Sequence, residues 1–371
     1  MNLSEIRIEI DKLDRAILDL FQKRMDLCRQ VAAYKQENKM PIFQEAREIE
    51  ILDKMENLAE EDMKAGSRAL FTVIIDISKQ LQRQVISKSE DEPVFGQPDF
   101  ASAEKVGCQG CPGANSETAI RTFFPEHEPL YYPSFHEVFE AVESGEIKYG
   151  VLPIYNSTAG SVTQTYDLMG KYNFFITAMN QVEVANCLAV RPGTKLGEIT
   201  RVYSHPQALS QCSDFIKKHQ LKMKDYDNTA TAARKVAESD QPIAAICSER
   251  CAMLNGLEIL ESRISNVLPN YTRFICITKD IEVAPEADVI SVMLTLPNVP
   301  GSLSNLLMKF FLQNIDLVKI ENRPIQDGSF DVVFYIDFKG NLRDRSVALF
   351  ITELCKSCKE FKLLGNAVSF S

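Results

Sequence analysis

The chain has 371 residues, a formal net charge of −10 and an ordinary composition, with 45% hydrophobic and 25% charged residues. Its length indicates two or three domains, and the acidic balance without a Lys/Arg-rich run excludes nucleic acid and anionic membranes as expected partners. Ten cysteines, no secretory leader and no apolar run approaching about 18 residues predict a cytoplasmic protein with reduced thiols.

The first predicted element is one long helix from Ser4 to about Lys39. Its apolar residues recur at spacings of three and four, and neither Gly nor Pro interrupts it. We expect Ser4 as the N-cap, with Glu5 in the first turn. Shorter helices are predicted over 45–60 and 67–86. A helix of about 36 residues is roughly 54 Å long, too long for two shorter partners to cover, so we predict that this domain dimerises.

Three cations on the long helix suggest a site. At about 100° per residue, Arg24 and Lys35 face the same way within roughly 20°, whereas Arg7 is rotated by roughly 100°. In an antiparallel dimer, the partner subunit's Arg7 could enter the site instead. Solvated charges on an amphipathic helix are the alternative. The other helices would add three polar side chains: Glu48, Ser78 and Gln82.

Residues 1–88 resemble the all-helical, dimeric chorismate mutase domain. Six residues match the site positions of that family: Arg7, Arg24, Lys35, Glu48, Ser78 and Gln82. Gln44 stands where an Asp is common. The resemblance implies a pericyclic rearrangement of chorismate to prephenate, in which two arginines clamp the carboxylates. Lys35 and Gln82 would hydrogen-bond the ether oxygen as its negative charge grows. Glu48 would accept from the ring hydroxyl.

A linker is predicted at 89–103, which holds two Pro, a Gly and an acidic cluster. After it, residues 104–280 alternate short apolar runs with helical patterns. This alternation indicates an α/β domain. Polar residues follow several of the strands, as expected for a ligand at the carboxyl ends of parallel strands. The Gly-rich turn that ends at Ser116 precedes a helix, so its N–H groups could cradle a carboxylate. Further polar positions are Asn156, Ser157, Gly160, His205, Gln207 and Thr229.

Thr272 and Arg273 set a hydroxyl beside a cation at the mouth of an apolar strand. A guanidinium can hold a carboxylate bidentately, while the neighbouring hydroxyl donates a proton to the same ligand. A strand that merely begins with a surface Thr-Arg pair is the alternative.

The run Asn270-Tyr271-Thr272-Arg273-Phe274 resembles the N-x-T-R-F signature of prephenate dehydratases, and the order of the preceding motifs resembles their catalytic domain. The resemblance implies two α/β lobes of periplasmic-binding-protein type, Thr272 as proton donor and Arg273 as a carboxylate ligand. It also implies that the polar positions above, from Ser116 to Thr229, bind the substrate. The chain departs from the family at three positions: Asn115, Tyr155 and Asn186 replace an aromatic residue, a Glu and a His.

The last predicted domain, 288–371, has the order strand–helix–strand–strand–helix–strand, with a turn at 326–329. It resembles a phenylalanine-binding ACT regulatory domain of ferredoxin-like, α+β fold. The resemblance rests on Pro300 with Gly301, Ser302 and Leu303, and on Glu321, Asn322, Arg323 and Pro324. The family usually has Ser where Asn322 stands. A ferredoxin-like fold without an effector site is the alternative, since this fold alone says nothing of function.

Two cysteine pairs, Cys108/Cys111 and Cys355/Cys358, have C-x-x-C spacing, but they are far apart in the sequence. We expect free thiols, with neither a metal nor an organic cofactor.

Together the resemblances imply a cytoplasmic homodimer or homotetramer that converts chorismate through prephenate to phenylpyruvate and is inhibited by phenylalanine. Two alternatives remain. One is a mutase joined to a domain with a non-aromatising or vestigial prephenate activity, and the other is a protein that only senses ligands.

Overall fold

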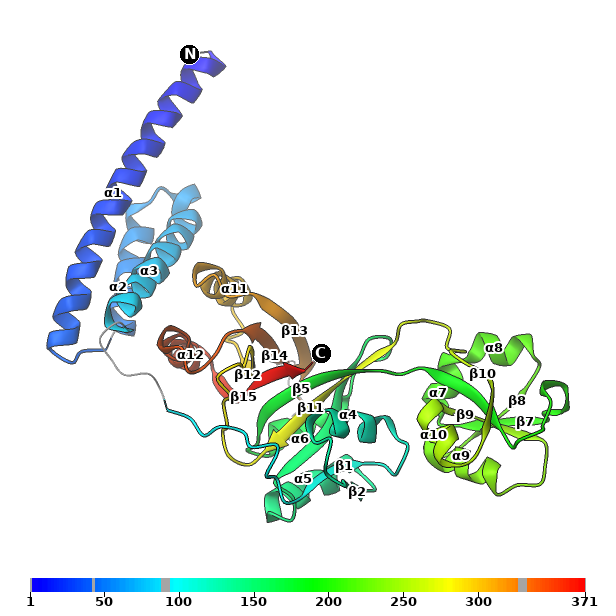
Figure 1. Ribbon diagram of the computed structural model, residues 1–371. Helices are drawn as coiled ribbons and strands as arrows, with labels where there is room; N and C mark the ends of the chain where they lie inside the picture. Colours follow the sequence, from blue (N-terminus) through cyan, green and yellow to red (C-terminus); the bar gives the residue numbers. More distant parts are fainter. Residues whose placement is uncertain (1, 42–43, 88–93, 326–331, 371) are drawn as a thin grey trace. The chain divides into compact units, whose positions relative to one another are not determined.

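The computed structural model describes residues 2–41, 44–87, 94–325 and 332–370 (Figure 1). The chain divides into two compact units. The first unit comprises Met1–Val94 and Val292–Lys362, and the second comprises Phe95–Ser291 and Leu363–Ser371. No helix in the described ranges is long and apolar enough to cross a membrane.

The first unit begins with the helices predicted from the sequence: α1 (Leu3–Glu37), α2 (Glu45–Leu58) and α3 (Lys64–Ser87). Both α1 and α2 pack against α3. The prediction of Ser4 as the N-cap is wrong, because the helix already begins at Leu3. Asn2 is the N-cap, and its side chain accepts from the N–H of Glu5, whose carboxylate in turn accepts from the N–H of Asn2. This reciprocal capping box satisfies two donors that a Ser4 cap would leave open.

Helix α1 buries side chains only in its second half, where Met25, Ala32 and Lys35 are covered. Its first half leaves large apolar side chains exposed to solvent: Leu3, Ile6, Ile8, Ile10, Leu13, Ile17, Leu18 and Leu20. An apolar stripe of this length has no covering element among the described residues of one chain.

The first unit also holds α11 (Ser302–Leu312), β13 (Leu317–Pro324), β14 (Val332–Lys339) and α12 (Arg345–Ser357). Strands β12 (Val289–Thr295) and β15 (Glu360–Phe370) each pass from one unit to the other. The element order agrees with the predicted order, and the turn predicted at 326–329 lies outside the described residues. A core of edge-on aromatic rings holds this part together: Phe310, Phe338 and Phe350.

The second unit contains two lobes, each built on its own sheet (Figure 1). In lobe A the strand order is β15-β5-β11-β3-β1-β2, with β4 beside β3. Its other strands are β1 (Val106–Gln109), β2 (Leu130–Tyr132), β3 (Tyr149–Asn156), β4 (Gly160–Ser161), β5 (Phe175–Glu183) and β11 (Tyr271–Thr278). Its helices are α4 (Asn115–Phe123), α5 (Phe135–Ser144) and α6 (Thr163–Lys171). Phe100 and Ala103, from the predicted linker, belong to the core of this lobe.

Lobe B has the strand order β10-β6-β9-β7-β8. Its strands are β6 (Asn186–Val190), β7 (Arg201–Ser204), β8 (Lys222–Asp225), β9 (Ile243–Ser248) and β10 (Glu258–Glu261). Its helices are α7 (Pro206–Gln211), α8 (Ser213–Lys218), α9 (Thr229–Ala237) and α10 (Glu249–Leu254). The chain crosses between the lobes after β5 and again before β11 (Figure 1). The two crossings are joined where the N–H of Val184 donates to the carbonyl of Asn270 at 2.7 Å.

The direction of β11 decides what meets at the edge of lobe A. Strand β11 is antiparallel to β3, so its beginning lies beside the end of β3, and Thr272 pairs with Asn156 in the register. Residues 116 positions apart in the sequence therefore become neighbours where β3 ends.

Candidate active sites

A cavity of about 430 Å³ is lined by both lobes of the second unit. Six predicted substrate or catalytic residues line it: Ser116, Asn156, His205, Gln207, Thr229 and Thr272. Asn115 and Asn186, two of the departures from the family pattern, also line it. The structure therefore brings together residues from α4, β3, α7, α9 and β11.

Asn156 is the centre of the hydrogen bonding at this site. Its amide nitrogen Nδ2 is 2.9 Å from Thr272 Oγ1, 2.8 Å from Asn270 Oδ1 and 3.2 Å from the carbonyl of Tyr271. Its Oδ1 accepts from the N–H and hydroxyl of Thr158 and from the N–H of Ala159. With both ends of its amide engaged and only 6% of the residue exposed, Asn156 is held in one orientation.

This arrangement has a chemical consequence for Thr272. The amide of Asn156 donates to Oγ1, so the hydroxyl hydrogen of Thr272 is left to point elsewhere, and the side chain lines the cavity. A donor aimed at Oγ1 also stabilises negative charge that develops there when the proton leaves. Asn270, which is 1% exposed, also holds Asn156 in place, because its Oδ1 accepts from Asn156 Nδ2.

The structure does not bring Arg273 to the cavity. Thr272 and Phe274 line it, and because alternate side chains of a strand point to opposite faces, Arg273 lies on the other face of β11. Tyr155, the third departure, pairs with Arg273 across β3 and β11 and is also absent from the lining. Arg273 as a carboxylate ligand therefore stays a prediction, and the described lining does not include it.

Two other predicted residues shape the loop after β3 instead of lining the cavity. Ser157 Oγ accepts from the N–H of Tyr271 at 2.9 Å, and its own N–H donates to the carbonyl of Tyr271 at 2.8 Å. Gly160 has φ +81, a left-handed conformation that favours glycine, and it pairs with Asn156 as β4 begins.

The described lining holds no Lys or Arg, and its one carboxylate is Asp227. An anionic ligand would therefore meet hydrogen-bond donors rather than guanidiniums. Helix α4 supplies such donors at its start, because its N-cap, Ala114, has no side-chain acceptor for the first N–H groups.

A second candidate site lies between α1 and α3 in the first unit. Lys35, Ser78 and Gln82 are each under 10% exposed. Ser78 Oγ donates to Cys28 Sγ at 2.9 Å, and Gln82 Nε2 donates to Ser78 Oγ at 3.3 Å. Arg24 Nη1 approaches the same sulfur at 3.9 Å. Four of the predicted mutase residues thus lie near the thiol of Cys28: Arg24, Lys35, Ser78 and Gln82.

Charges at this second site act on one another. Burial lowers the pKa of Lys35, and the nearby Glu48 and Cys28 oppose that shift. Glu48 Oε2 accepts from Lys79 Nζ at 3.0 Å, a contact that sequence analysis did not foresee. Arg7 lies 17 residues before Arg24 on the same helix, about 25 Å along its axis, so it cannot reach this site within one chain.

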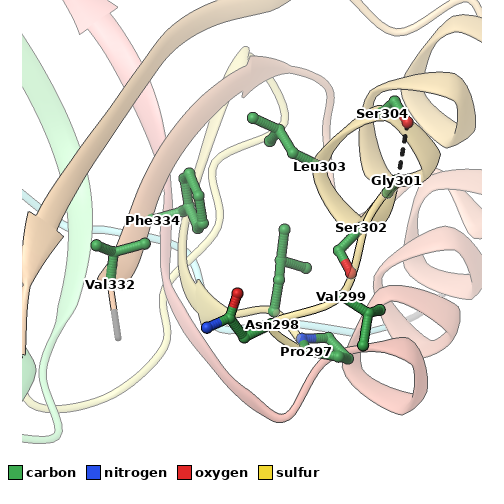
Figure 2. A pocket seen from close by; sticks show the side chains of 10 residues that line it. Pro297, Asn298, Val299, Gly301, Ser302, Leu303, Ser304, Val332 and Phe334 are labelled. Atoms are coloured by element: carbon green, nitrogen blue, oxygen red, sulfur yellow. Dashed lines mark hydrogen bonds between the residues drawn. The ribbon is translucent and has the colours of Figure 1, made fainter. Parts of the chain in front are cut away.

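A third candidate site is a cavity of about 410 Å³ at the start of α11 (Figure 2). Gly301 is the N-cap of α11 at φ +89, and its carbonyl accepts from Ser304 Oγ at 2.9 Å. Figure 2 shows Leu303 of α11 and Phe334 of β14 on the walls of this space. The predicted residues Gly301, Ser302 and Leu303 line it, whereas Glu321, Asn322, Arg323 and Pro324 do not. These four lie on the adjoining strand β13, with Asn322 paired to Phe334.

Known proteins match most of this architecture. A family model for chorismate mutase type II matches residues 6–83, and one for prephenate dehydratase matches residues 106–282. The bifunctional chorismate mutase/prephenate dehydratase of Enterobacter agglomerans is 30% identical over 98% of this chain and 95% of its own length. This chain belongs to the bifunctional chorismate mutase/prephenate dehydratase family.

Two solved structures each match more than two thirds of this chain. The prephenate dehydratase of Arthrobacter aurescens, solved in complex with L-Phe, has a TM-score of 0.64 at 27% identity, over 71% of this chain and 90% of that chain. GqqA, described as a novel type of quorum quenching acylase, has a TM-score of 0.65 at 26% identity, over 72% of this chain and 98% of that chain. The predicted two-lobed dehydratase fold is confirmed.

The chorismate mutase match falls inside the predicted domain 1–88, and the prephenate dehydratase match begins inside the predicted domain 104–280 and ends two residues beyond it, at 282. The boundaries themselves, and the separate domain at 288–371, stay predictions. Asn270, Cys28 and Lys79 were missed as site residues. A signal existed only for Asn270, which opens the N-x-T-R-F signature.

Proposed function

We propose that this chain is an enzyme with two activities, a chorismate mutase and a prephenate dehydratase, and that phenylalanine regulates it. The observation that carries the dehydratase assignment is the hydrogen-bonded set Asn270–Asn156–Thr272 at the wall of the interlobe cavity. Because Asn156 donates to Thr272 Oγ1, the hydroxyl hydrogen of Thr272 is available to a ligand in the cavity, as a proton donor requires.

The proposed dehydratase step uses one acid. The Thr272 hydroxyl gives its proton to the ring hydroxyl of prephenate, which leaves as water. The bond between the ring and its carboxylate breaks in the same process, CO₂ departs, and the electron pair completes the aromatic ring of phenylpyruvate. Asn156 stabilises the charge on Thr272 Oγ1 until solvent restores the proton. The start of α4, with Asn115 and Ser116, would receive a substrate carboxylate.

A hydrolytic alternative fits this site less well. GqqA is described as an acylase, and an acyl transfer at Thr272 would need a base on its hydroxyl. Asn156 instead supplies an N–H donor to that oxygen, which favours a proton-donating role.

The proposed mutase is a dimer with shared sites. Lys35, Ser78, Gln82, Arg24 and Glu48 of one chain would be completed by the partner subunit's Arg7. The exposed apolar half of α1 supports this proposal, because a second copy would cover it. The site needs no acid or base; Lys35 and Gln82 would stabilise the ether oxygen as its bond breaks.

The proposed effector site is the cavity at the start of α11, in a C-terminal domain of ACT type with a ferredoxin-like fold. Leu303 and Phe334 would contact the phenyl ring of phenylalanine, and the first N–H groups of α11 would face its carboxylate. A relative solved with L-Phe bound supports this choice of effector. We place Glu321 to Pro324 at an interface between two such domains.

The deciding experiment supplies prephenate to the purified chain near neutral pH and follows phenylpyruvate by ultraviolet absorbance. Thr272→Ala should lose about 10²- to 10⁴-fold in kcat, the usual contribution of a general acid. Thr272→Ser, the matched control, keeps the hydroxyl and should retain most of the activity. Equal rates for wild type and Thr272→Ala would indicate a vestigial or ligand-sensing domain. Loss of prephenate without formation of phenylpyruvate would indicate a non-aromatising reaction.

A further inference from the structure

Glu117, the residue that follows Ser116 in α4, is a buried carboxylate that the proposed chemistry does not use. Its side chain is only 3% exposed. It accepts hydrogen bonds from the N–H of Gly113 at 2.6 Å, from Arg121 Nε at 2.9 Å and from Arg250 Nη2 at 2.9 Å. Gly113 and Arg121 belong to lobe A, whereas Arg250 is the second residue of α10 in lobe B. One carboxylate therefore joins the two lobes.

A second contact beside it reinforces the same junction. Ser248 Oγ, at the N-cap of α10, donates to the carbonyl of Gly113 at 3.1 Å. Gly113 has φ +89, and a Cβ there would lie 3.0 Å from Cys251 Cα. Only glycine allows the turn before α4 to lie this close to α10. The turn that leads into the cavity is thus fixed to the opposite lobe through both its backbone and Glu117.

The charges favour a persistent contact. Burial raises the pKa of Glu117, but hydrogen bonds from Arg250, Gly113 and Arg121 outweigh burial and lower it to about 2. The carboxylate is therefore ionised throughout the neutral range. Arg250 is 45% exposed and Arg121 is 29% exposed, so each guanidinium keeps part of its hydration while it binds Glu117.

The consequence lies one residue away from this carboxylate. Ala114, Asn115 and Ser116 line the cavity, and Glu117 continues their helical turn. We propose that Arg250 is a positioning residue of the dehydratase, which holds the cavity-lining start of α4 against lobe B through Glu117. This inference rests on the proposed dehydratase function. In it, Arg250 keeps the two lobes in the arrangement in which both contact the substrate.

Arg121 provides a matched comparison. It pairs with the same carboxylate, but from the same helix at i+4, so its removal takes a cation from Glu117 without loosening the lobes. Neutralising Arg250 or Arg121 leaves Glu117 with one guanidinium and the N–H of Gly113, so both variants should fold.

The test compares Arg250→Met and Arg121→Met in the full chain, with kcat and KM for prephenate and the mutase rate as an internal standard. We expect Arg250→Met to raise KM about tenfold, the scale of one charge-assisted hydrogen bond, with kcat changed less than about twofold. Arg121→Met should raise KM about twofold or less, and Arg250→Lys should recover part of the loss. In Glu117→Gln, adding Arg250→Met should change KM little further. Equal KM effects of the two Met variants, or additivity with Glu117→Gln, would overturn the inference.

Hydrogen exchange separates this inference from the proposed function. If the wild type shows no dehydratase activity, the function fails, yet the contact can still be measured. Arg250→Met should accelerate amide exchange in residues 110–117 at least about threefold more than Arg121→Met does. Similar exchange in wild type and Arg250→Met would refute the positioning role.

Discussion

Replacing Asn156 by Asp tests the proposed mechanism with almost no change in shape. The carboxylate keeps an acceptor for Thr158 and Ala159, but it puts a second oxygen where Nδ2 now lies 2.8–3.2 Å from three oxygen atoms. Thr272 would then donate its proton to that oxygen instead of to the substrate. Removing one preorganised donor costs about 10² to 10³ in kcat, so we expect a loss of that size near neutral pH.

The sign of the pH dependence follows from burial. In the variant, burial and the carbonyl oxygens of Asn270 and Tyr271 beside the new oxygen raise the pKa of the carboxyl group, whereas the donors on Oδ1 lower it. We expect burial and the two carbonyl oxygens to outweigh those donors, so that the folded pKa lies above the unfolded value of about 4. In its protonated form the O–H replaces the lost N–H donor. The variant should therefore regain dehydratase activity as the pH falls through the raised pKa. Its free energy of unfolding, relative to wild type, should decrease as the pH rises from about 4 towards that value.

The assay is phenylpyruvate formation across a pH series, with thermal unfolding measured on the same samples. Asn180→Asp is the matched control, because Asn180 is 3% exposed, lies on β5 of the same sheet and is absent from the cavity lining. It should lose stability without losing kcat. The reasoning is refuted if Asn156→Asp keeps the wild-type kcat at neutral pH, or if Asn180→Asp lowers kcat as much.

Three further outcomes are expected. Arg7→Ala and Arg24→Ala should each lose at least about 10² in mutase kcat. An equimolar mixture of the two variants that has exchanged subunits should recover up to about a quarter of wild-type activity, because about half of its dimers are heterodimers with one intact site of two. No recovery in verified heterodimers would exclude shared sites. Phe334→Ala should weaken phenylalanine inhibition by about tenfold or more with basal dehydratase kcat unchanged. If a dose–response assay shows unchanged inhibition, phenylalanine binds at another site. Tyr155→Glu should change KM for prephenate by less than about twofold, because Tyr155 faces Arg273 outside the cavity, and a larger change would place that face in the site.

Sequence patterns predicted the elements whose apolar residues are periodic. Helices α1 to α3, the strand that begins beside Thr272 and the element order of 288–371 were all predicted. Strand β8 was missed because its sequence, Lys222–Asp225, is exposed throughout and has a single apolar residue. Strand β10 escaped for a related reason, since an edge strand beside β6 needs little apolar patterning.

The sequence predicted which residues form the candidate site better than it predicted how they are arranged. Thr272, Asn156 and Ser116 follow or begin elements in a recognisable order, so their meeting could be expected. The exclusion of Arg273 depends on which face of β11 is turned to the cavity, and alternation along the strand fixes that face only once Thr272 is placed. The pairing of Glu117 with Arg250 joins residues 133 positions apart and follows no local pattern, so sequence alone could not reveal it.

Asn270 connects the two crossings between the lobes with the proposed proton donor, Thr272. The carbonyl of Asn270 accepts from the N–H of Val184 where the two crossings between the lobes meet, and its side chain accepts from Asn156, which holds Thr272. A rotation of lobe B about these crossings would act on Asn270 first. Because both ends of the Asn156 amide are already hydrogen-bonded, such a rotation would also change the orientation of the Thr272 hydroxyl. A change in the lobe arrangement would therefore reach Thr272 through Asn270. The Glu117–Arg250 contact lies outside this connection, so we expect it to act on KM for prephenate rather than on kcat.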